Sequence, residues 1–291
     1  MASLLIVNPR ASKVDERVTA DVLAALPGEI HLRRTQAPGH ATILAQEAHG
    51  SVEAIYVFSG DGGFNEVLNG SDGTVPLGFL PGGGTSVLTR ALGLPRDPVA
   101  AAGRIAQGRL RRISLGRANG RRFGFAAGVG LDAELLRLLD ERGRDSTGRR
   151  PGDRVFASLA LRTLAAHRGR FEPILEVEGL GRAAFVLVGN CDPYSYAGRV
   201  PLHATPRATF EGGLDLVAPR SVAPLAWPRL AGYLVSGRGH ERARDLLTAH
   251  DVDRLVIRCE APTPLQVDGE DLGDAVSIEL EAERDAVTVL C

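Results

Sequence analysis

Short apolar runs alternate with helical patterns over the first third of the chain. Aliphatic and β-branched residues predict strands at residues 3–7, 29–32, 54–58 and 77–80. Apolar residues at helical spacing predict helices between and after these strands, at residues 15–26, 40–49, 64–68, 86–92 and 98–107. Strands and helices that alternate in this way form a parallel sheet with helices on both faces. The pattern therefore predicts an α/β domain, to which we assign residues 1–116.

After residue 115 the pattern changes to short strands with few helices between them. Strands are predicted at residues 122–126, 174–177, 183–189, 214–217, 255–258, 265–267, 276–280 and 287–290. Helices are predicted at residues 132–139, 154–167 and 227–235, and residues 141–153 form a polar loop rich in Gly and Arg. We therefore predict a mostly antiparallel, β-rich second domain over residues 117–291. Its final strand can also pack back on the first domain.

Composition narrows the class of protein. The 291 residues are 44% hydrophobic, enough to form the cores of two domains. The 34 basic and 35 acidic side chains nearly cancel and only 5% of residues are aromatic, so we expect no nucleic-acid partner. The three cysteines are widely spaced, which suits free thiols in a reducing compartment. No apolar stretch reaches the ~20 residues of a membrane span, so we expect a cytoplasmic protein.

Glycine-rich segments follow two of the predicted strands. The first is Ser59-Gly60-Asp61-Gly62-Gly63-Phe64-Asn65-Glu66, which opens a predicted helix. Glycines allow a phosphate to approach the backbone, and a helix N-terminus provides free N–H groups for it. An aspartate in such a loop suits a divalent cation that arrives with a nucleotide. An ordinary strand-to-helix turn, with Asp61 as a cap, explains these residues equally well.

The second glycine-rich segment shifts the balance towards phosphate binding. It is Pro81-Gly82-Gly83-Gly84-Thr85-Ser86, directly after the next predicted strand. Ligands of open α/β sheets lie beyond the carboxyl ends of the strands, where both segments fall. Neither segment matches the P-loop or the dinucleotide fingerprint. Asn8-Pro9-Arg10 adds an amide and a guanidinium at the end of the first strand, although Asn-Pro alone indicates only a turn.

A third motif lies near the C-terminus, where Gln266-Val267-Asp268-Gly269-Glu270-Asp271 separates two apolar runs. Asp-Gly in this position is a strong hairpin-turn signal, so the local pattern favours a structural role. The functional alternative is that Asp268 accepts or orients the proton of a hydroxyl group during phosphoryl transfer.

Taken in order, these segments resemble the diacylglycerol kinase catalytic family, which includes bacterial lipid kinases and sphingosine kinases and is related to NAD kinases. The resemblance rests on IVNPRAS, SGDGGFNEVLNG, LGFLPGGGTSVLTRALGLP, FGFAAGVGLDAELL, LVGNCDPYSYAGRVPLHATPRATFEGGLDLV and LQVDGE, and it covers almost the whole chain. It implies an N-terminal nucleotide-binding domain, a C-terminal lipid-substrate domain and an ATP site in the cleft between them.

The resemblance also implies residue roles. Asp61 would lie near Mg²⁺, and Asp268 would be the proton acceptor, with Glu270 beside it as a second catalytic residue. The residues it places against ATP are Asn8, Pro9, Arg10, Ala11, Ser12, Thr35, Gly60, Asp61, Gly62, Gly63, Phe64, Asn65, Glu66, Gly83, Gly84 and Thr85.

The chain departs from the family pattern at several positions. Ser59 and Gly63 stand at the first and last places of the usual GGDGT motif. Ser86 and Val87 replace the asparagine and aspartate of a Thr-x-Asn-Asp motif, and Glu211-Gly212 replaces a pair of aspartates linked to a structural magnesium. The structural metal is therefore in doubt, and the catalytic metal network is thinner than in most members.

These observations predict an ATP- and Mg²⁺-dependent kinase that phosphorylates a lipid alcohol, with diacylglycerol as the default substrate by resemblance. We expect a cytoplasmic enzyme that visits the membrane surface when active, and a homodimer is compatible with the pattern. A catalytically silent nucleotide- or lipid-binding member is the alternative, and an NAD kinase is a weaker one. We expect Asp268→Asn to keep the fold and lose turnover.

Overall fold

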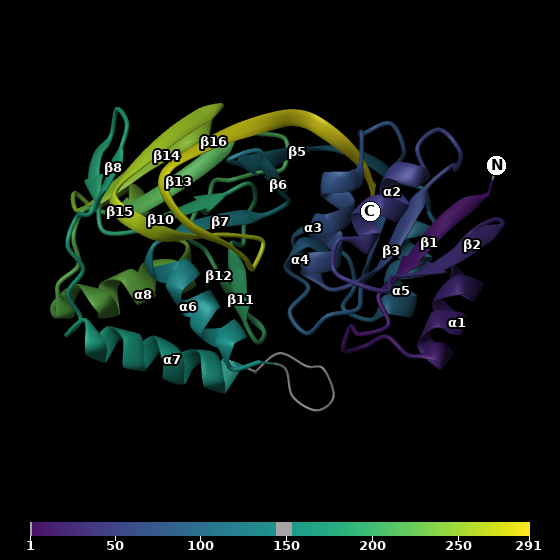
Figure 1. Ribbon diagram of the computed structural model, residues 1–291, viewed down its shortest axis with the longest axis horizontal. Coiled ribbons are helices and arrows are strands. Elements are labelled where there is room, and N and C mark those ends of the chain that lie inside the picture. The colour runs from purple at the N-terminus through teal and green to yellow at the C-terminus, as the bar shows by residue number, and fades with distance from the viewer. Residues whose placement is uncertain (1, 144–152) are drawn as a thin grey trace. The chain divides into compact units, whose positions relative to one another are not determined.

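A computed structural model describes residues 2–143 and 153–291 (Figure 1). The chain divides into two compact units: unit 1 contains residues 1–115 and 284–291, and unit 2 contains residues 116–283. That these units bind the nucleotide and the lipid substrate, respectively, stays a prediction. Most of the polar loop expected at residues 141–153 lies outside the described residues.

Unit 1 is built on a parallel sheet in the order β2-β1-β3-β4. Its strands are β1 (Ser3–Val7), β2 (Ile30–Arg34), β3 (Ile55–Ser59) and β4 (Leu77–Pro81). Its helices are α1 (Glu16–Ala25), α2 (His40–Glu47), α3 (Asp61–Gly70), α4 (Val87–Ala91) and α5 (Pro98–Ile105). The end of the last strand of the chain adds to this sheet beside β4, in parallel, with Val289 opposite Leu77.

Burial explains why these strands could be predicted from the sequence. Strands β1, β3 and β4 are buried along their whole length, as continuous apolar runs require, whereas β2 is at the edge and is largely exposed. Helix α1 packs with α5, and α2 packs with α3. The strand order reverses between β1 and β3, and ligands of doubly wound sheets bind at such a switch point.

Unit 2 has a mostly antiparallel sheet in the order β14-β13-β10-β7-β15-β16. Its strands are β6 (Arg121–Phe123), β7 (Ala126–Val129), β8 (Leu175–Val177), β9 (Gly181–Ala183), β10 (Val186–Gly189), β11 (Ser195–Ala197), β12 (Val200–Leu202), β13 (Leu214–Pro219), β14 (Leu246–Val252) and β15 (Arg254–Val267). Strands β5 (Leu110–Ala118) and β16 (Glu270–Leu290) belong to both units. The helices are α6 (Leu131–Glu141), α7 (Asp153–Ala166) and α8 (Trp227–Ser236), with the 3₁₀ turns η1 (Pro224–Ala226) and η2 (His240–Arg242).

The predicted fold class, a parallel α/β domain followed by a mostly antiparallel β-rich domain, is confirmed. Some elements of the second domain differ from the prediction. Strand β16 is one continuous strand of 21 residues where two strands were expected, at residues 276–280 and 287–290. The predicted strand 122–126 is instead two strands, β6 and β7, with a break at residues 124–125. Strands β5, β11, β12 and β14 were not predicted.

Within the described part of the chain, no helix combines the length and the apolar character that crossing a bilayer requires.

Candidate active-site residues

Three loops of unit 1 converge at the carboxyl edge of its sheet, after β1, β3 and β4. Backbone hydrogen bonds join them: Lys13 N donates to Gly82 O over 2.9 Å, and Gly82 N donates to Ser59 O over 2.7 Å. Asn8 N also donates to Phe58 O over 3.0 Å. The structure thus brings together the three segments in which most of the predicted ATP contacts lie.

The two glycine-rich loops touch each other through their backbones. A Cβ atom added to Gly83 would lie 2.9 Å from the Cα of Gly60, and one added to Gly82 would lie 2.9 Å from Ser59 O. Both positions therefore need glycine for packing alone. Gly84 differs, because it is exposed and a Cβ there would meet nothing within 4 Å. A glycine at position 84 is not explained by packing within the protein.

Asp61 lies in the first glycine-rich loop, and its side chain is hydrogen-bonded to the backbone that follows the second. Its Oδ2 accepts a hydrogen bond from Val87 N at 3.0 Å, and its Oδ1 accepts one from Leu88 N at 3.2 Å. The carboxylate therefore caps α4, whose own N-cap residue, Ser86, gives no side-chain cap. Asp61 is also the first residue of α3, where a negative charge is favoured by the helix dipole. The sequence left open a cap on the helix that Asp61 itself begins, but the N-cap of α3 is Gly60 and has no side-chain cap; the Asp61 carboxylate instead caps α4, in the second loop.

Ser59 and Gly63, the two departures from the GGDGT pattern, form one steric unit. A Cβ at Gly63 would lie 2.1 Å from Ser59 Oγ and 2.7 Å from Ser59 Cβ. Real Cβ atoms do not approach this closely, so a side chain at position 59 excludes one at position 63. The Ser59 hydroxyl is buried, and among the described residues it has no hydrogen-bond partner.

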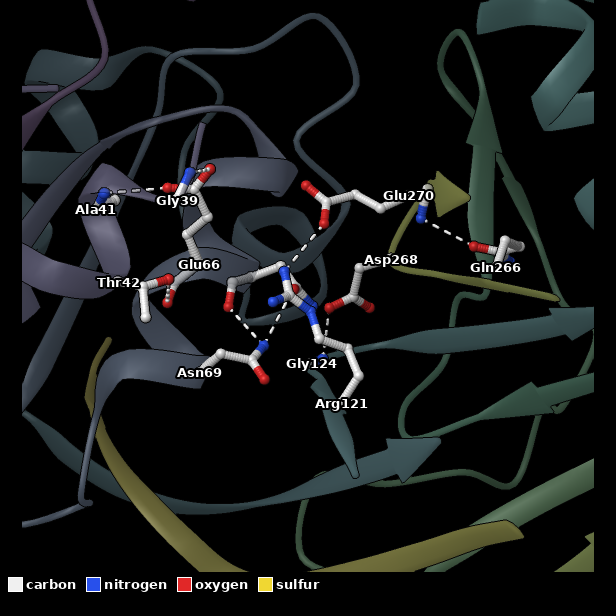
Figure 2. Close-up of polar contacts among 12 residues, drawn as sticks. Gly39, Ala41, Thr42, Glu66, Asn69, Arg121, Gly124, Gln266, Asp268 and Glu270 are labelled. Atoms are coloured by element: carbon white, nitrogen blue, oxygen red, sulfur yellow. Dashed lines mark hydrogen bonds and ion pairs between the residues drawn. The ribbon is translucent and has the colours of Figure 1, made fainter. Parts of the chain in front are cut away.

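The remaining residues of the first loop have structural roles in unit 1. Phe64 is buried and packs edge-on against Phe79 at 5.1 Å between ring centroids, and Asn65 is fully buried. The Glu66 carboxylate accepts hydrogen bonds from Gly39 N at 2.9 Å and Ala41 N at 3.0 Å, so it caps α2 (Figure 2). That these three residues contact ATP stays a prediction.

The loop after β1 is shaped by its own asparagine. Asn8 Oδ1 accepts a hydrogen bond from Arg10 N at 3.0 Å, and Asn8 O accepts one from Ala11 N at 3.1 Å. Pro9, Arg10 and Ser12 are exposed on this turn, as is Thr85 on the second glycine-rich loop. Thr35 follows β2 and donates its backbone N–H to Val7 O at 2.9 Å, which places it beside the end of β1. These residues are exposed or partly exposed around the converging loops.

In unit 2, Asp268 lies in the tight turn between β15 and β16. Asp268 and Gly269 both have positive φ angles, 50° and 80°, as a two-residue type I′ hairpin requires. The Asp268 side chain is nevertheless only 4% exposed. Its Oδ2 accepts a hydrogen bond from Gly124 N at 2.6 Å (Figure 2). Its Oδ1 accepts bonds from Phe125 N at 2.9 Å and Ala126 N at 3.2 Å. Three backbone donors therefore fix the orientation of this carboxylate.

A buried polar network supports the same turn, and the sequence analysis did not identify it. Gln266 Oε1 accepts a hydrogen bond from Gly269 N at 2.9 Å, while Gln266 Nε2 donates to Asp132 Oδ2 at 2.7 Å and to Tyr194 Oη at 3.1 Å. Tyr194 Oη also donates to Asp132 Oδ2 at 2.7 Å. Burial raises the pKa of Asp132, an effect that these hydrogen bonds partly offset. Burial and the neighbouring Asp132 charge raise the pKa of Tyr194 well above its usual value. The only sign of this network in the sequence was the presence of polar residues within otherwise apolar runs.

Glu270 follows the turn and is paired within unit 2. Arg121 Nη2 donates to its Oε2 at 3.1 Å, and both side chains are partly exposed (Figure 2). Glu270 lies two residues after Asp268 and is the first residue of β16, where it pairs with Val267 of β15.

Few side chains near the glycine-rich loops could act as ligands of a metal ion. In the ranges 2–143 and 153–291, no group of three or more His, Cys, Asp or Glu side chains is arranged to hold a metal ion. Val87, at the position of the motif aspartate, is buried and has no ligating atom in its side chain. Asp61 is the carboxylate nearest in sequence to the converging glycines.

Comparison with known proteins matches the N-terminal part of this arrangement. Residues 2–118 match the diacylglycerol kinase catalytic domain. The resemblance to this family is confirmed. The diacylglycerol kinase of Bacillus subtilis (strain 168) is 38% identical over 140 residues, which are 45% of this chain and 46% of that protein. A diacylglycerol kinase of Staphylococcus saprophyticus is 33% identical over 133 residues, 43% of this chain and 44% of that protein. These matches span less than half of either relative.

Solved structures match over nearly the whole chain. A putative diacylglycerol kinase from Bacillus anthracis str. Sterne has a TM-score of 0.78 at 25% identity, covering 99% of this chain and 94% of that one. An NAD kinase from Archaeoglobus fulgidus in complex with ATP has a TM-score of 0.51 at 10% identity, covering 100% of this chain and 94% of that one. The second likeness concerns the fold alone.

Proposed function

We propose that this protein is an ATP-dependent lipid kinase that transfers the γ-phosphoryl group to the hydroxyl of a diacylglycerol-type lipid. The observation that carries the proposal is the backbone contact between the loops of Gly60 and Gly83, which follow the neighbouring strands β3 and β4 at the carboxyl edge of a parallel sheet. Two glycine-rich loops and the N-terminus of α3 offer backbone N–H groups at that edge, as a polyphosphate requires. The names of the relatives support a lipid acceptor over other alcohols.

In this proposal the residues of unit 1 hold the nucleotide. In the first turn of α3, the N–H groups of Gly62 and Gly63 come before the first hydrogen bond of the helix, which Phe64 N donates to Gly60 O, and in this proposal they bind phosphate oxygens. The exposed Gly84 allows close approach, and the Arg10 guanidinium supplies positive charge. Asp61 positions the second loop by capping α4.

Asp268 is the proposed proton acceptor of the transfer. The lipid hydroxyl oxygen forms a bond to the γ-phosphorus, the bond from that phosphorus to the bridging oxygen breaks, ADP leaves, and the hydroxyl proton passes to the carboxylate. Because the transition state of phosphoryl transfer is loose, such a residue acts mainly by orienting the nucleophile. The three backbone donors and the Gln266 network suit that role, because they hold the carboxylate in one orientation.

Magnesium fits only as an ion that arrives with the nucleotide. Mg²⁺ is commonly held by one or two carboxylates together with substrate phosphates and water. Each carboxylate oxygen of Asp61 accepts one backbone amide at α4, and a carboxylate is the kind of protein ligand that Mg²⁺ takes. When bound, the ion would neutralise charge on the phosphates.

The alternative is a member that binds ATP without phosphorylating a lipid. Val87 favours it, since a buried valine replaces the aspartate of the motif. Purified protein incubated with Mg²⁺, γ-labelled ATP and a panel of lipid alcohols decides between them. Labelled lipid that depends on Asp268 supports the kinase, whereas ATP binding with no labelled product from any lipid supports the alternative. Label transferred to NAD would instead identify an NAD kinase.

A further inference from the structure

Helices α7 and α8 of unit 2 expose apolar side chains at helical spacing. Helix α7 exposes Phe156, Ala157, Leu161 and Ala165, and α8 with the turn before it exposes Leu225, Pro228, Ala231 and Val235. Leu161, Leu225 and Val235 are 68%, 94% and 54% exposed. Single exposed apolar residues are ordinary on a protein surface, but a repeat of this kind along two helices indicates a contact surface. We call these eight residues the α7–α8 face.

The two helices are neighbours within unit 2 (Figure 1). Trp227, at the start of α8, donates its indole N–H to Gly169 O at 2.9 Å, just beyond the end of α7. The Trp227 ring also packs against Phe171 at 5.6 Å between centroids. A Cβ on Gly169 would lie 3.3 Å from Pro224, the residue before Leu225. The exposed turn at Leu225 therefore lies next to the C-terminal end of α7.

The two chain segments that carry the α7–α8 face contain basic residues and no acidic ones. Residues 155–170 and 220–240 each contain three arginines and no Asp or Glu, in a chain with 34 basic and 35 acidic residues in all. Among the described residues, no carboxylate pairs with Arg162, Arg168, Arg170 or Arg238. Arg229 is paired, with Asp245 from outside these segments. Glu134 of α6 also lies beside this region, 3.7 Å from His167 Nε2. The face is thus apolar in its outward positions, and basic side chains outnumber acidic ones around it.

We propose that the α7–α8 face docks the enzyme on the surface of a bilayer that contains anionic phospholipids. This inference rests on the proposed function, since a lipid substrate brings the enzyme to a bilayer. Helices that lie in a membrane interface have this character: apolar residues enter the acyl boundary while basic residues meet anionic headgroups. A second copy of the chain is a poorer occupant, because a two-fold contact would place these arginines against their own copies.

Sedimentation with lipid vesicles, without ATP, tests the docking surface directly. We expect the full chain to bind vesicles of phosphatidylcholine mixed with phosphatidylglycerol more tightly than vesicles of phosphatidylcholine alone. Leu161→Ser combined with Val235→Ser should weaken binding by roughly tenfold or more, because two apolar side chains no longer enter the interface. Arg162→Gln combined with Arg168→Gln should weaken binding to the anionic vesicles by about fivefold for each arginine. Val276→Ser is the matched control, since Val276 is 56% exposed on β16 of the same unit.

In the vesicle assay, three results would overturn the inference: no binding of the wild type, equal binding to both kinds of vesicle, or losses no larger than that of Val276→Ser. A concentration-dependent dimer that Leu161→Ser and Val235→Ser dissolve would assign the face to a second copy instead. Thermal unfolding of each variant verifies that it is folded. The kinase proposal is tested separately, with wild-type protein and a short-chain diacylglycerol dissolved as monomers. Failure there with vesicle binding intact would remove the activity and keep the docking face.

Discussion

The close approach of Ser59 to Gly63 leads us to predict that Gly63→Ala changes the free energy of unfolding, and that the sign of the change depends on the residue at position 59. Gly63 lies in the first turn of α3, so Gly63→Ala should gain about 1 kcal/mol from helix propensity. In the wild-type protein the new Cβ would lie 2.1 Å from Ser59 Oγ and 2.7 Å from Ser59 Cβ. Rotating the serine side chain moves the Oγ but not the Cβ, so the overlap is not relieved by a rotamer change.

Overpacking of a buried site costs about 1–3 kcal/mol, and an overlap with a fixed Cβ belongs at the upper end. We therefore expect Gly63→Ala alone to destabilise the protein by about 2 kcal/mol, the overlap outweighing the propensity. In the background of Ser59→Gly the overlap is absent, and the same substitution should stabilise by up to about 1 kcal/mol. The coupling energy between the two positions is then about 3 kcal/mol.

Urea unfolding of the wild type, the two single variants and the double variant, followed by far-ultraviolet circular dichroism, measures this coupling. Equal m-values across the four proteins make their free energies of unfolding comparable. Ser59→Ala is the control background, because it retains the Cβ and should rescue Gly63→Ala only in part. A Gly63→Ala effect of the same size and sign in the wild-type and Ser59→Gly backgrounds would refute the steric explanation of the altered motif.

Three further predictions concern the proposed site. Gly84→Ala should leave thermal stability unchanged yet weaken ATP binding measured by calorimetry. Gly83→Ala should instead lower stability, because its Cβ overlaps with Gly60. Unchanged ATP affinity in Gly84→Ala would remove that glycine from the nucleotide site. Asp268→Asn should lower the free energy of unfolding by about 2–3 kcal/mol, because its amide nitrogen must face a backbone donor of residues 124–126; a neutral effect in urea unfolding would contradict this. Burial raises the pKa of Asp132, so its ionisation costs stability as the pH rises above its ordinary value of 3.8. Asp132→Asn cannot ionise and should gain stability relative to the wild type as the pH rises above 3.8, and melting temperatures of the two proteins that stay parallel as the pH rises would count against it.

The structure changes the expectation for Asp268→Asn. From the sequence, Asp-Gly between apolar runs indicated a turn, and an asparagine is well tolerated in such turns. Both oxygens of Asp268 accept backbone N–H groups from a loop more than 140 residues earlier in the chain. A carboxylate accepts on both sides, whereas an amide accepts on one, so the substitution is predicted to cost stability as well as activity.

The strands of unit 1 could be predicted because their burial is uniform. Strands β1, β3 and β4 lie in the middle of a parallel sheet with both faces covered, and their residues are therefore a continuous apolar run. The glycine-rich segments were readable for the same local reason, since a strand end followed by glycines and a helix start is a pattern of neighbouring residues. Strand β16 was divided in the prediction because many of its 21 residues are exposed and polar, which hides a continuous strand.

What the sequence determined by itself was the order of strands β1 to β4 and helices α1 to α5, the fold class, and the position of each motif at a strand end. The tertiary structure alone decided which groups the motif side chains contact: Asp61 with α4, Glu66 with α2, and Asp268 with the break between β6 and β7. The physical reason is the distance along the chain over which each kind of interaction acts. Burial periodicity and turn chemistry act over a few residues, whereas a carboxylate is satisfied by whichever donors the folded chain brings to it, and those donors can lie anywhere in the sequence.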